Sequence, residues 1–137
     1  MKGILSFKEA SDYVYSHYGR RVELRQVSDK TVRITVAQKV ILATIKISID
    51  ITIEKVEDTK IEISYSGSKG IDLLIKGALH LVNEKLPQLA PMITETSGNH
   101  LTIDLEKIEQ AKVVTEKLRL SDIIIQEDAL ELTAELK

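Results

Sequence analysis

Apolar and polar residues alternate along residues 41–53, a period of two that is typical of a strand with one buried face. At about 3.3 Å per residue this segment would extend roughly 40 Å, well beyond a usual strand, so we expect it to bend, twist or overhang its neighbours. The same alternation precedes the segment and returns after it, which predicts an antiparallel meander with one apolar and one polar face. The apolar positions of this meander are Val32, Ile34, Val36, Ile41, Ala43, Ile45, Ile47, Ile49, Ile51, Ile53, Ile61, Ile63 and Tyr65.

Two other segments follow the helical period of three and four residues. Ser6 and Glu9 have the spacing of a capping box, and the apolar positions after them predict a first helix to about Tyr18, followed by a C-terminal cap at Gly19. A longer amphipathic helix is predicted from Ile71, with an end near Pro87 or Pro91. Its apolar surface is broad, as expected of a helix that lies in a concave sheet.

The remaining residues favour strands. Two short strands are expected around Ile93 and over 101–105, and a final hairpin over 118–136, whereas 107–117 has no clean period. We therefore expect one domain over residues 1–137 with an α+β fold, in which a strongly curved antiparallel sheet wraps around one long amphipathic helix, with a short N-terminal helix.

Composition excludes several classes of function. The chain has no Cys and three His, which removes disulfides, thiolate metal sites and Cys nucleophiles and disfavours a multi-His centre. Its formal charge of -2 gives no electrostatic footprint for nucleic acid. The start does not read as a secretory signal and no apolar run reaches the length of a membrane span, so a cytoplasmic location without integral membrane insertion is expected.

No segment predicts catalysis, a metal site or a cofactor. The Gly67 to Gly70 turn lacks the full spacing of a phosphate-binding loop. Tyr and Arg residues over 13–21 are typical of an amphipathic helix at a sheet edge. The acidic groups lack the spacing of a calcium loop and are read as solvated charges, so we expect no enzyme. These acidic groups are Asp104, Glu106 and Glu109, and Asp122, Glu127 and Asp128.

The order of elements resembles that of tubular lipid-binding (TULIP-like) modules. The likeness lies in the strand of residues 40–53, in the helix of 71–91 and in 118–132, which looks like the closing hairpin of bacterial relatives. The resemblance implies that acyl chains or other lipids bind in a groove lined by aliphatic side chains. It carries over no catalytic motif.

The function predicted from these patterns is non-catalytic binding of a lipid or other elongated apolar ligand between the long helix and the curved sheet. The alternative is an interaction module that self-associates, as a homodimer or larger assembly, through a strand edge or an apolar face. The same apolar surface would equally form an ordinary filled core. The residues expected to line the ligand site are Ile45, Ile47, Ile49, Ile51, Ile75, Leu79 and Val82.

Overall fold

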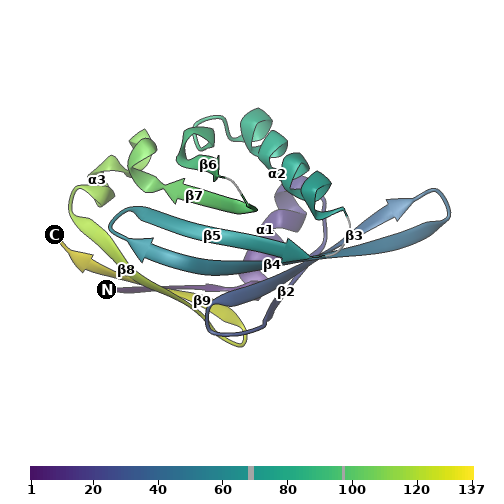
Figure 1. Ribbon diagram of the computed structural model, residues 1–137, viewed down its shortest axis with the longest axis horizontal. Coiled ribbons are helices and arrows are strands. Elements are labelled where there is room, and N and C mark those ends of the chain that lie inside the picture. The colour runs from purple at the N-terminus through teal and green to yellow at the C-terminus, as the bar shows by residue number, and fades with distance from the viewer. Residues whose placement is uncertain (68–69, 97) are drawn as a thin grey trace.

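The computed structural model describes residues 1–67, 70–96 and 98–137, which form two antiparallel sheets and short helices (Figure 1). The larger sheet has the strand order β2-β3-β4-β5-β7-β6 and the smaller one β1-β9-β8. The larger sheet is built from β2 (Val22–Gln26), β3 (Thr31–Val40), β4 (Ala43–Glu57), β5 (Lys60–Gly67), β6 (Ile93–Thr96) and β7 (His100–Asp104). The smaller sheet is built from β1 (Lys2–Ser6), β8 (Leu118–Ile125) and β9 (Ala129–Leu136).

The larger sheet has one polar and one aliphatic face, as the alternation predicts. On the polar face Arg33 on β3 donates two hydrogen bonds to Asp50 on β4, at 2.8 and 3.1 Å, and hydroxyl pairs continue this ladder. One such pair joins Thr35 and Ser48 at 2.9 Å. On the aliphatic face Ile49 lies opposite Ile34 and is buried.

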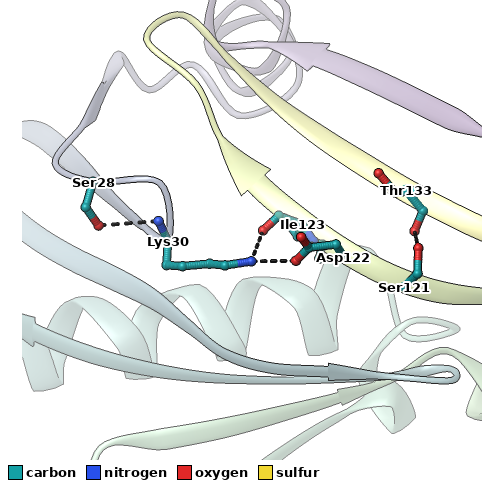
Figure 2. A network of polar contacts seen from close by, with 6 residues as sticks. All are labelled: Ser28, Lys30, Ser121, Asp122, Ile123 and Thr133. Atoms are coloured by element: carbon teal, nitrogen blue, oxygen red, sulfur yellow. Dashed lines mark hydrogen bonds and ion pairs between the residues drawn. The ribbon is translucent and has the colours of Figure 1, made fainter.

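The smaller sheet closes one end of the larger one. The backbone N–H of Ile125 on β8 donates to the carbonyl of Asp29 in the β2–β3 turn at 2.7 Å. Figure 2 shows the Lys30 ammonium of that turn donating to the Asp122 carboxylate and to the Ile123 carbonyl. Ile123 and Ile125 of β8 are both buried, so the smaller sheet contributes to the hydrophobic core at this end of the molecule.

The helices end where local sequence signals predict. α1 (Phe7–Tyr18) has the expected capping box between Ser6 and Glu9, and Gly19 takes the left-handed conformation at its C-terminal cap. α2 (Ile71–Lys85) ends just before Pro87, which cannot supply a helical N–H. Residues 105–115 contain short 3₁₀ turns and the four-residue α3 (Lys112–Thr115).

The expected wrapping of a strongly curved sheet around one long helix is wrong. α2 has only 15 residues, and β8 and β9 pair with β1 in a second sheet instead of extending the first. Leu86 leaves the helical region, with φ -134° and ψ 56°, and the chain then passes through a 3₁₀ turn at Ala90–Met92 to the edge strand β6. The structure is therefore mostly β, with two antiparallel sheets and short helices.

Some element bounds also differ from the prediction. β1 was not expected, and it forms because its backbone pairs with the distant β9. Residues 41–42 form the turn between β3 and β4 instead of beginning a strand, and β4 continues to Glu57 through a register shift between Ile53 and Lys55. In the Gly67 to Gly70 turn, residues 68–69 lie outside the described part of the chain.

Candidate apolar binding site

A glycine at the end of β5 allows α2 to begin directly on the aliphatic face of the larger sheet. Gly67 pairs with Ile49, and a Cβ built on Gly67 would lie 2.5 Å from the Ser48 carbonyl oxygen and 2.8 Å from Cγ2 of Ile71. Only glycine fits such a close approach without a shift of the backbone. Ile71, the first residue of α2, is buried there, so the N-terminal end of the helix is anchored beside β4.

Beyond this anchor the apolar side of α2 is incompletely covered. Ile71 is the buried residue of the helix, whereas Ile75, Leu79 and Val82 are each half-buried. Leu73 is 76% exposed. The helix therefore presents aliphatic side chains that the rest of the chain only partly removes from water.

Leu79 and Val82 line an open hollow of about 290 Å³ between α2 and the β6 edge. Its other walls come from residues that the sequence analysis did not assign to the site, namely Asn83, Ala90, Ile93 and Glu95. The periodicity that places 71–85 on a helix and 93–96 on a strand does not show that these two elements face each other. Their juxtaposition is a property of the tertiary fold.

The predicted residues on β4 share one face but differ sharply in exposure. Ile49 is 3% exposed and belongs to the core, and Ile47 and Ile51 are half-buried. Ile45 is 48% exposed. The four isoleucines do not line the 290 Å³ hollow, so the structure places the seven predicted residues in two neighbouring groups, one on β4 and one on α2.

Glu95 on β6 places one carboxylate in the wall of the hollow. Burial, followed by the negative charges of Glu95 and Asp72, raises the pKa of the Tyr65 phenol. Tyr65 occupies an aliphatic-face position of β5, opposite Ile51. A ligand group near Glu95 would therefore meet negative potential, which favours a neutral or cationic group over a carboxylate or phosphate.

The chain exposes more surface than a compact protein of its size. Its solvent-accessible surface is 9142 Å². The size scaling of compact monomers gives about 7,200 Å² for a chain of 15.4 kDa, so the surplus is roughly 2,000 Å². The half-exposed side of α2 and the projecting β3–β4 hairpin contribute to this surplus.

The strongest polar contacts have structural roles. The hydrogen bond from Lys30 lowers the pKa of Asp122 by favouring its ionised form (Figure 2). Asp104 accepts from the Glu106 backbone N–H at 3.1 Å and caps a 3₁₀ turn. Within residues 1–67, 70–96 and 98–137, no group of three or more His, Asp or Glu side chains is placed to hold a metal ion.

The helices of the described residues are too short or too polar to cross a bilayer. Comparison with known protein families, with curated proteins and with solved structures finds no match to this chain. The resemblance to TULIP-like modules therefore stays a prediction.

Proposed function

We propose that this protein binds an elongated apolar molecule, such as the acyl chain of a lipid, between α2 and the aliphatic face of the larger sheet. The observation that carries the proposal is the partial exposure of aliphatic side chains on both elements. Ile75, Leu79 and Val82 on α2 and Ile47 and Ile51 on β4 are all half-buried. Covering such side chains is favourable by about 25 cal/mol per Å² of apolar surface.

The size of the hollow favours a narrow, extended ligand. Its volume of about 290 Å³ lies at the lower end of the range of about 300–1,000 Å³ for small-molecule pockets. A chain-like molecule could occupy the hollow beside Leu79 and continue along the β4 isoleucines, whereas a bulky compact ligand would leave most of its surface in water. The negative charge of Glu95 supports a neutral or cationic polar group at the β6 end.

The proposal is tested by native mass spectrometry of the purified protein, followed by organic extraction and identification of any bound molecule. A lipid bound at a fixed ratio is the expected result. Leu79→Ala should reduce the bound fraction, because it removes aliphatic surface from the wall of the hollow. Leu73→Ala is the matched control, since it makes the same change at an exposed position of the same helix and should leave the bound fraction unchanged.

Two results would contradict the proposal. If Leu73→Ala and Leu79→Ala lower the bound fraction equally, the ligand does not occupy the hollow. If the protein remains empty after incubation with lipid vesicles and instead forms a stable dimer, the exposed aliphatic surface serves self-association. The surplus surface of roughly 2,000 Å² would be sufficient for a standard protein interface, so the mass of the empty species decides between the two functions.

A further inference from the structure

The hairpin between β3 and β4 projects beyond the rest of the molecule (Figure 1). The pairing of β2 with β3 ends at Val36, and the described pairing of β5 with β4 begins at Ile49. Between these points β3 and β4 pair with each other from Ala37 and Lys46 to Val40 and Ala43. We call residues 37–46 the arm. It is a two-stranded ribbon, a structure that is only marginally stable in water by itself.

The tip of the arm is apolar and fully exposed. Ile41 and Leu42 form its two-residue turn, and their exposed fractions are 98% and 97%. Polar residues and glycine are usual at the two central positions of such a turn. The Ile-Leu pair instead places two large aliphatic side chains in water. Residues that do not suit their local backbone or solvent environment are expected at functional positions.

The arm is also basic. It contains Lys39 and Lys46 and no acidic residue, although the whole chain has a formal charge of -2. At about 3.3 Å per residue, Lys46 lies roughly 13 Å from the tip along β4. The apolar faces of interfacial helices enter a bilayer by about 5–10 Å, and we take the same depth for the tip of the arm. With the tip at that depth, Lys46 would lie at the level of the lipid headgroups.

We propose that the arm docks on an anionic membrane surface, with Ile41 and Leu42 in the outer acyl region and Lys46 beside lipid phosphates. The shape of the arm favours a bilayer over a protein groove, because the exposed aliphatic residues lie at the end of a narrow ribbon. A bilayer admits such a tip from any direction, and its negative surface potential attracts Lys46. This docking requires no ligand beside α2, so it is independent of the proposed function.

The test is co-sedimentation of the full chain with vesicles of an equal mixture of phosphatidylcholine and phosphatidylserine. The decisive variant is Ile41→Asn/Leu42→Gly, which removes the apolar tip and introduces the residue pair that two-residue hairpin turns prefer. The hairpin should therefore be retained. We expect the partition coefficient to fall at least tenfold, because both aliphatic side chains lose their apolar environment.

Two further variants separate the causes of binding. Val113→Asn/Val114→Asn removes two other adjacent exposed aliphatic side chains and should bind vesicles like the unmodified protein. Lys46→Glu should lower binding to the anionic vesicles by about fivefold or more, and increasing salt should weaken the binding of the unmodified protein.

The docking proposal is overturned if the unmodified chain does not sediment with these vesicles, or if the Asn-Gly variant binds as strongly as the unmodified chain. It is also overturned if Ile41→Asn/Leu42→Gly abolishes a concentration-dependent dimer without changing vesicle binding, because the arm would then contact a second copy. Lipid retention measured by native mass spectrometry is a separate readout. Loss of vesicle docking with retained lipid would therefore leave the proposed function intact.

Discussion

Truncation of two isoleucines on the same face of β4 should have very different effects on stability. Ile49 is 3% exposed and lies opposite Ile34 in the middle of the sheet, whereas Ile45 is 48% exposed and lies in the arm. Ile49→Ala removes three buried carbon atoms, worth about 2.4 kcal/mol of transfer free energy, and leaves a cavity. We therefore expect a loss of about 3 kcal/mol for Ile49→Ala and of about 1 kcal/mol or less for Ile45→Ala.

The measurement is thermal unfolding followed by circular dichroism, with urea unfolding as a second probe. For 137 residues the entropy of unfolding predicts a shift of about 3 °C per kcal/mol, so Tm should fall by about 10 °C for Ile49→Ala and by about 3 °C or less for Ile45→Ala. Equal shifts would refute the reasoning, since they would mean that the arm is packed as tightly as the centre of the sheet.

Two glycine substitutions and one pH titration test other parts of the fold. Gly67→Ala should destabilise the protein by about 1–3 kcal/mol, because the new Cβ would lie 2.5 Å from the Ser48 carbonyl oxygen. Gly77→Ala on α2 meets open space and should stabilise the protein by about 0.4–1 kcal/mol, and urea unfolding measures both. The hydrogen bonds from Arg33 lower the pKa of Asp50, so this pair contributes stability above the unfolded-state pKa of about 3.9 that is lost as pH falls through the folded-state pKa. Acid unfolding below about pH 4 should be less steep in Asp50→Asn, and an unchanged acid limb would show that the pair contributes nothing.

Local signals in the sequence were sufficient to predict much of the secondary structure. The capping box of Ser6 and Glu9, the C-terminal cap at Gly19 and the end of α2 before Pro87 are all confirmed, because each depends on groups within a few residues of one another. The alternation predicted a long strand that would bend, twist or overhang its neighbours, and β4 has 15 residues with its first part in the arm. Periodicity of this kind also predicted which face of the larger sheet is polar.

Long-range pairing had no comparable signal in the sequence. The pairing of β1 with β9 joins the two ends of the chain and places β8 and β9 in a second sheet. Together with the short α2, this second sheet replaces the expected helix wrapped by one curved sheet. The hollow beside α2 likewise depends on Ile93 and Glu95 of an edge strand that follows two prolines. Such contacts depend on which backbone edges and side-chain surfaces meet in space, and these are not encoded by the spacing of residues along one element.

The β4 isoleucines also show which properties follow from the sequence pattern and which depend on the tertiary structure. The sequence by itself determined that Ile45 and Ile49 share a face, because successive side chains of a strand alternate in direction. Only the tertiary structure decided that one is half in water and the other is buried. β4 is flanked on both sides where β5 begins to pair at Ile49, and it has β3 alone as a neighbour at Ile45. Burial depends on the number of neighbouring elements, and an alternating pattern carries no information about that number.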